Sequence, residues 1–176
     1  MKIQKIQQIC KNERRITVIN TEKGQWICTG YAIYPLLNLP KLTKDNIFIL
    51  FDLTGEKQEK IYFEEKDALP AELCLEDYER NELAIEPEPY NILRSGTVMI
   101  PFVGAKGGYF INKKFLAPFK EPTFFERLSA NGRPYLVVKE GLFLVGAIMP
   151  IIDKGELAEW LVNTGEGLIL NEKTNG

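Results

Sequence analysis

The chain has 176 residues, of which 45% are hydrophobic and 26% charged, and this ordinary globular composition excludes disorder of the whole chain. Its net charge of -2 argues against a strongly basic nucleic-acid binder and against an extreme acidic mimic. It has no histidine, which excludes serine–histidine and cysteine–histidine catalytic pairs, histidine metal sites and histidine proton shuttles.

The cysteines and the apolar segments indicate a cytoplasmic protein. Cys10, Cys28 and Cys74 have no paired spacing, so we expect neither a disulfide framework nor a metal site. The first fifteen residues lack the apolar core of a signal peptide. The longest apolar run, residues 141–152, is too short to span a bilayer as a helix and predicts a buried strand. We therefore expect no membrane contact and no cofactor.

The first 62 residues predict a helix–hairpin–helix unit. The spacing of Ile3, Ile6 and Ile9 indicates one apolar helical face, and two β-rich runs follow, RITVIN and QWICTGYAIY. After the two prolines 35 and 40, Thr43 is a candidate N-cap for a helix that ends near Gly55.

The central part of the chain, residues 63–120, divides into an acidic stretch and a hairpin. Residues 52–88 carry thirteen acidic and four basic side chains, whereas residues 89–120 carry five basic side chains and no acid. Pro70, Pro87 and Pro89 interrupt the acidic stretch and its end, so we expect an irregular insertion. The run GTVMIPFVGAKGGYFINKKF predicts a hairpin that turns through GAKGG, which lacks the spacing of a phosphate-binding loop.

The last part of the chain, residues 121–170, predicts a second helix–hairpin–helix unit. Pro122 and Thr123 indicate the start of a short helix. A hairpin should turn at Gly141, and a second helix is expected over the run LAEWLVNTG, before a frayed tail at 171–176. Residues 30–36 (GYAIYPL) and 146–151 (GAIMPI) share a Gly-Ala-Ile-Pro order, which suggests two related halves.

These elements predict a single α+β domain over residues 1–176. We expect two helix–β-hairpin–helix halves, packed pseudo-symmetrically, with the central hairpin and the irregular acidic insertion between them. We therefore expect the protein to act through contact surfaces and to have no catalytic cleft.

Two surfaces are candidate partner-binding sites. The acidic stretch can imitate a phosphate track for a basic groove on another protein, and the hairpin interleaves lysines with aromatics, as nucleic-acid-binding surfaces do. The more common explanation is structural: a solvated acidic surface for the first pattern, and a solvated lysine face over a packed sheet for the second. The candidate residues are Glu76, Asp77, Glu79 and Glu82 on the first surface and Lys106, Tyr109, Lys113 and Lys114 on the second. Trp26, Tyr31 and Tyr34 are further aromatic candidates for partner contact or core filling.

The G-x-A-x-Y-P stretch, the leucine–proline segment after it and the late G-R-P-Y hairpin resemble short proteins of conjugative and other mobile elements in gut Firmicutes. That group has no established activity, so the resemblance implies an accessory role in a bacterial cytoplasm and transfers no site residue. The combination of helices with paired strands also resembles, more weakly, the repeat of a DNA sliding clamp, which would require oligomerisation.

We therefore expect a non-enzymatic, protein-binding accessory factor of a mobile element that modulates or inhibits a host protein. A nucleic-acid-associated, clamp-like module is the alternative, and a small enzyme that uses carboxylates or lysine is the third hypothesis. A homodimer is compatible with the sequence.

Overall fold

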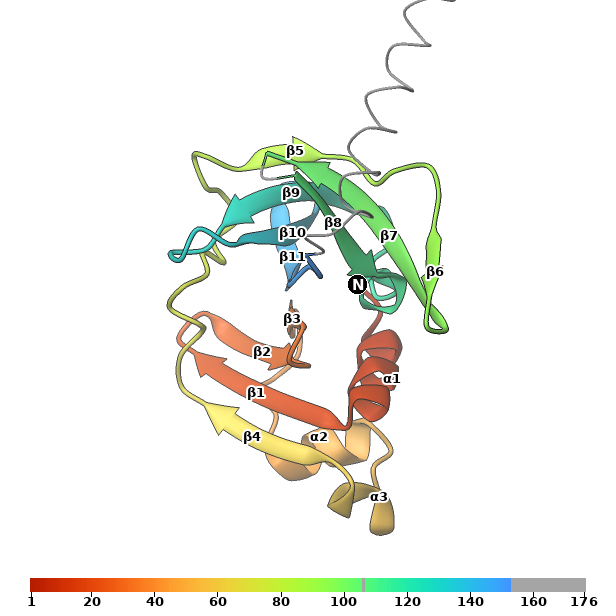
Figure 1. Ribbon diagram of the computed structural model, residues 1–176. Coiled ribbons are helices and arrows are strands. Elements are labelled where there is room, and N and C mark those ends of the chain that lie inside the picture. The colour runs from red at the N-terminus through yellow and green to blue at the C-terminus, as the bar shows by residue number, and fades with distance from the viewer. Residues whose placement is uncertain (106, 153–176) are drawn as a thin grey trace, which may run out of the picture.

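The structure, a computed structural model, describes residues 1–105 and 107–152 (Figure 1). Strands dominate it, and the helices are short. Among the described residues, no helix has both the length and the apolar character needed to cross a bilayer. The elements in chain order are α1 (Ile3–Glu13), β1 (Arg15–Thr21), β2 (Gly24–Cys28), β3 (Ala32–Pro35), α2 (Lys44–Leu50), α3 (Glu56–Glu59), β4 (Tyr62–Lys66), β5 (Leu83–Ile85), β6 (Ile92–Arg94), β7 (Thr97–Gly104), β8 (Gly107–Asn112), the 3₁₀ helix η1 (Lys113–Leu116), β9 (Thr123–Leu128), β10 (Pro134–Glu140) and β11 (Phe143–Ile148).

The strands form two sheets. The large sheet has eight strands in the order β4-β1-β2-β3-β11-β10-β9-β5, and the small sheet has the order β6-β7-β8. All neighbouring strands are antiparallel except β1 and β4, which are parallel. Single bridges, Pro87 to Phe102 and Phe110 to Ile151, connect the small sheet to segments that flank the large one.

The repeated Gly-Ala-Ile order marks the line where β3 meets β11. Ala32 pairs with Ile148, and Ile33 pairs with Ala147, so the two Ala-Ile dipeptides lie opposite each other in one antiparallel ladder. A side chain at Gly146 would place its Cβ 2.7 Å from Phe119 and 3.2 Å from the Ile33 carbonyl oxygen. Glycine is required there because the backbone of β11 approaches both groups closely.

The prediction of two helix–β-hairpin–helix halves is wrong. The large mixed sheet replaces them, because residues 123–128 form strand β9 where the sequence suggested a helix. Phe124 and Phe125 lie on opposite faces of the sheet, and aromatic residues favour such a pleated, half-buried surface. Pro122 and Thr123, which indicated the start of a helix, therefore stand at the start of a strand. The helix expected over LAEWLVNTG and the tail at 171–176 lie outside the described residues.

Several local predictions are confirmed. Helix α1 buries Ile6 and Ile9, and α2 begins after Thr43, whose hydroxyl accepts a hydrogen bond from the backbone N–H of Asn46 in a capping box. The hairpins β7–β8 and β10–β11 form where expected. The run QWICTGYAIY, however, is two strands, because the chain turns at Gly30 with a φ of 95°.

The large sheet buries side chains on both faces. On its inner face the core includes side chains from α1, α2, η1 and the small sheet, and Figure 1 shows α1 and the small sheet on the same side of the large sheet. On its outer face a smaller cluster forms around Tyr135, Val137 and Leu144. No helix covers that outer cluster in the described part of the chain; the irregular segment between β4 and β5 covers it instead.

Candidate functional site

The acidic segment, residues 67–82, crosses the outer face of the large sheet. Its three leucines, Leu69, Leu73 and Leu75, pack against the outer cluster. The Glu72 carbonyl also accepts a hydrogen bond of 2.9 Å from the backbone N–H of Ala130, in the β9–β10 turn. The apolar residues of this segment thus attach it to the sheet. Its acidic residues differ in environment: some are exposed and others form buried contacts.

Arg127 on β9 organises the backbone of the acidic segment. Its guanidinium is fully buried and donates hydrogen bonds of 2.8 Å to the carbonyl oxygens of Cys74 and Glu76. It also forms a two-pronged ion pair with Glu82. The Tyr135 hydroxyl donates to the Cys74 carbonyl at 3.0 Å and accepts from the Cys74 N–H at 2.9 Å. These contacts hold the irregular backbone in one conformation.

Glu82 is the anionic centre of this buried network. Its second carboxylate oxygen accepts a hydrogen bond from Lys139, whose side chain is only 7% exposed. Burial opposes ionisation of Glu82, but the hydrogen bonds from Lys139 and Arg127 outweigh it and hold the pKa of Glu82 below its usual value. Glu82 therefore acts within the fold, as the counter-ion of two buried cations.

Asp77 fastens the acidic segment to the β10–β11 hairpin. Its carboxylate accepts a 2.8 Å hydrogen bond from the backbone N–H of Leu144. Three large side chains lie within two residues of this bond, and all are mainly exposed: Tyr78 (73%), Leu142 (84%) and Phe143 (67%). Exposed aromatic and aliphatic side chains are frequent anchors in protein interfaces.

The remaining acidic side chains of the segment are available at its surface. Glu72 and Glu76 are exposed, and Glu79 is half-buried. Glu76 pairs with Lys23 at 2.7 Å, but both side chains are more than 60% exposed, and such surface pairs contribute little to stability. Glu79 accepts a hydrogen bond from the N–H of Asn81 at 3.1 Å.

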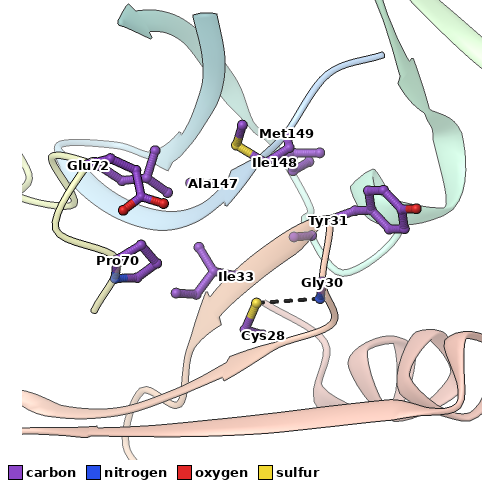
Figure 2. A pocket seen from close by; sticks show the side chains of 11 residues that line it. Cys28, Gly30, Tyr31, Ile33, Pro70, Glu72, Ala147, Ile148 and Met149 are labelled. Carbon is purple, nitrogen blue, oxygen red and sulfur yellow. Dashed lines mark hydrogen bonds between the residues drawn. The ribbon is translucent and has the colours of Figure 1, made fainter. Parts of the chain in front are cut away.

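An apolar pocket of about 170 Å³ opens where the start of the acidic segment meets β3 and β11 (Figure 2). Pro70, Glu72 and Leu73 line one side of it, and the ends of the paired strands line the other. Figure 2 shows the Glu72 carboxylate beside this pocket and the ring of Tyr31 directed away from the other labelled side chains. Tyr31 is 57% exposed. The pocket is smaller than the roughly 300–1,000 Å³ typical of small-molecule clefts.

Cys28 is the only cysteine among the described residues that line this pocket. Its sulfur lies 3.4 Å from the backbone nitrogen of Gly30, which donates a hydrogen bond to it. Cys28 is half-buried. Together with Ile33, Ala147 and Met149 it forms a wall suited to an apolar group.

The lysine–aromatic hairpin is arranged differently from the predicted contact surface. Tyr109 is 1% exposed and stacks against Phe102, with ring centroids 6.0 Å apart. Lys114 forms a 2.6 Å ion pair with Glu13, and Lys113 is exposed. Lys106 lies outside the described residues. Tyr109 and Lys114 are therefore committed to internal contacts.

The aromatic residues near the β2–β3 turn separate into three environments. Tyr34 is fully buried and donates a 3.0 Å hydrogen bond to the Phe115 carbonyl. Trp26 is half-buried against the outer cluster. Only Tyr31 among the three is mainly exposed, because the turn that splits the expected strand lifts it out of the sheet.

Sequence reasoning missed Arg127, Tyr135 and Lys139, which fix the acidic segment. Arg127 and Lys139 lie within runs that also contain buried apolar residues, and a buried cation requires an anionic partner. The surplus of acid upstream was the available signal, since one of those acids had to supply that partner.

Within residues 1–105 and 107–152, no three cysteine, aspartate or glutamate side chains are grouped so that they could hold a metal ion. Comparison with known proteins gave no match to a family model, a curated protein or a solved structure. The resemblances to mobile-element proteins and to the sliding clamp therefore remain predictions.

Proposed function

We propose that this protein is a non-enzymatic, protein-binding accessory factor of a bacterial mobile element that acts in the cytoplasm by modulating a host protein. The acidic segment and the apolar pocket beside it form the binding surface. The observation that supports this proposal is the buried anchoring of the segment by Arg127 and Tyr135. A surface whose backbone is already ordered loses less entropy when a partner binds.

The chemistry of the surface defines the partner. Glu72 presents negative charge beside the pocket, and Glu76, an exposed carboxylate paired with Lys23, lies on the same acidic segment, so the complementary partner is basic. The pocket volume suits a single apolar side chain of a basic segment, and Tyr31, whose ring points away from the pocket, offers an exposed ring to the part of the segment that stays outside it. The partner is therefore a protein with a basic surface segment that carries one protruding apolar side chain.

The proposal is tested by affinity capture from an extract of the host bacterium, followed by calorimetry with the purified captured protein. The acidic-surface variant is Glu72→Lys with Glu76→Lys. The matched control is Glu56→Lys with Glu59→Lys, which makes the same charge change on α3. A captured protein should bind the wild type and the control equally, and the acidic-surface variant at least about tenfold more weakly.

A second variant separates the pocket from the charge. Tyr31→Ala should weaken binding of the purified partner by about tenfold while leaving its salt dependence unchanged, because an aromatic anchor contributes through packing. The proposal fails if no protein distinguishes the acidic-surface variant from the control. It also fails if nucleic acid is the captured material and replacement of Lys113 releases it, since that result supports the alternative function.

A further inference from the structure

A second pocket, of about 180 Å³, lies between the C-terminal end of α1 and the α3 region. Leu53 and Ile61 form its apolar surface. Four of the six residues that line it are cations, and they come from two separate parts of the chain: Lys11, Arg14, Lys57 and Lys60. This basic pocket has different lining residues from the apolar pocket beside the acidic segment.

The charges in the basic pocket are only partly balanced. One oxygen of Asp52 lies 3.6 Å from the Lys11 ammonium and 3.7 Å from the Lys57 ammonium, so one exposed carboxylate is shared by two lysines. Neither Arg14 nor Lys60 has a carboxylate within 4.0 Å in the described part of the chain. Two of the four cations, Arg14 and Lys60, therefore lack a carboxylate partner among the described residues, and the four cations together with Asp52 carry a formal charge of +3.

Nearby acids do not line the pocket. Glu56 and Glu59 belong to α3, but neither is among the residues that form the wall. Glu13, on the last turn of α1, is paired with Lys114 at 2.6 Å. The pocket thus keeps its excess of positive charge within an acidic protein.

The helix end alone does not explain this arrangement. Lys11 and Arg14 follow the usual preference for cations at a helix C-terminus, but Lys57 and Lys60 belong to a different element. Arg14 also occupies the C-cap of α1 with a φ of 52°, a left-handed conformation in which glycine is the least strained residue. An arginine at this position adds a guanidinium to the pocket wall at the expense of some backbone strain.

We propose that the basic pocket binds one phosphoryl group of a small anionic ligand. A doubly charged phosphate can pair with Arg14 and Lys60, the two cations that lack a carboxylate partner in the described part of the chain, and guanidinium and ammonium groups are the usual phosphate-binding side chains. The apolar surface from Leu53 and Ile61 excludes water from one side and strengthens these contacts. The volume is below that of clefts that enclose whole ligands, so the rest of the ligand stays outside the pocket.

Inorganic phosphate is the probe for this site. Titration at constant ionic strength, followed through the backbone and methyl NMR signals of Leu53 and Ile61, should show saturable shifts with a dissociation constant of about 1 mM or below. Arg14→Gly should weaken binding by about tenfold and leave thermal stability unchanged or higher, because glycine relieves the left-handed strain. This variant separates a role in binding from a role in folding.

Two further variants keep the test decisive. Lys60→Ala should weaken phosphate binding by about tenfold, and Lys5→Ala, which removes an exposed lysine from the same helix as Lys11, should not change it. Absence of saturation at about tenfold higher phosphate overturns the proposal, and so does equal weakening by all three variants.

Single-stranded oligonucleotides with and without a 5′-phosphate distinguish the sources of the phosphoryl group. A gain in affinity from the terminal phosphate that Lys60→Ala abolishes supports the site. Binding that depends only on oligonucleotide length, with a steep loss in salt, reflects a polyelectrolyte effect and overturns it.

Discussion

Replacement of Arg127 by methionine removes the cation that fixes the acidic segment while keeping a long apolar side chain in its place. The carbonyl oxygens of Cys74 and Glu76 would lose the donor they share, and Glu82 would lose one of its two counter-ions. Lys139 remains beside Glu82, so that carboxylate stays partly paired. We expect the acidic segment to detach from the outer face of the sheet before the rest of the molecule unfolds.

The size of the effect follows from burial. Removing one partner of a buried ion pair destabilises a protein by about 3–5 kcal/mol. The remaining contact of Glu82 with Lys139 places Arg127→Met near the lower limit, at about 3 kcal/mol. A domain of this size has a total stability of about 5–15 kcal/mol, and about 3 kcal/mol corresponds to a fall in Tm of about 6–12 °C. The variant should therefore fold and be measurable.

Urea unfolding and limited trypsin digestion measure the two parts of this prediction. Urea unfolding should report the loss of stability, and trypsin should cleave faster at Arg80, an exposed residue within the acidic segment. Arg133→Met is the matched control, because Arg133 is an exposed arginine in the turn after β9 and should change stability by no more than about 0.5 kcal/mol.

The prediction is refuted if the free energy of unfolding of Arg127→Met lies within about 1 kcal/mol of the wild-type value and Arg80 is cleaved at the wild-type rate. That result would mean that the apolar contacts of Leu69, Leu73 and Leu75 alone hold the segment. A large loss of stability with unchanged cleavage at Arg80 would instead mean that Arg127 stabilises the sheet itself and does not hold the acidic segment in place.

Three further outcomes are expected. Because the folded-state pKa of Glu82 is lowered, its stabilising contribution is full above the unfolded-state pKa of about 4.3 and is lost as the pH falls through the folded-state value. Glu82→Gln should therefore unfold more easily than the wild type at neutral pH, and the difference should shrink on acidification, as measured by thermal unfolding between neutral and acidic pH. Gly146→Ala should destabilise the protein by about 1–3 kcal/mol in urea, since its Cβ would lie 2.7 Å from Phe119, and unchanged stability would contradict the close approach. Burial raises the pKa of Cys10 to about 12, so iodoacetamide should modify Cys28 well before Cys10 in the native protein, and equal rates by mass spectrometry would argue against this core.

The sequence was informative where local signals and tertiary packing agree. The apolar face of Ile6 and Ile9, the Thr43 cap and the turn at Gly141 are local features, and each forms as predicted. The segment around Phe124 was misread because Pro122 and Thr123 carry a helix-start signal. Its strand conformation depends on pairing with β10 and β5, which no local window of sequence reveals.

The candidate site was predictable only as a region. The excess of acid in residues 52–88 marked a region that contains the acidic segment, but the distinction between inward-facing Glu82 and outward-facing Glu76 depends on Arg127, which lies 45 residues after Glu82. The sequence offered Tyr109 as a candidate stacking residue, with a packed sheet under a solvated lysine face as the alternative, and the structure places Tyr109 in the core. Strand alternation limits each face to every second residue, and the sequence does not reveal which face is covered.

The repeated Gly-Ala-Ile order connects the fold to the proposed function. Pairing of β3 with β11 brings two small residues, Ala32 and Ala147, to the same short ladder. Both also line the apolar pocket, with Gly30 at its edge. Ala147 lies on the outer face and fills less space than its ladder partner Ile33, so it leaves part of the hollow that Pro70 and Leu73 cover from one side, whereas Ala32 faces the inner core. A repeat that the sequence suggested as a sign of architecture therefore also builds the surface on which we expect a partner to bind.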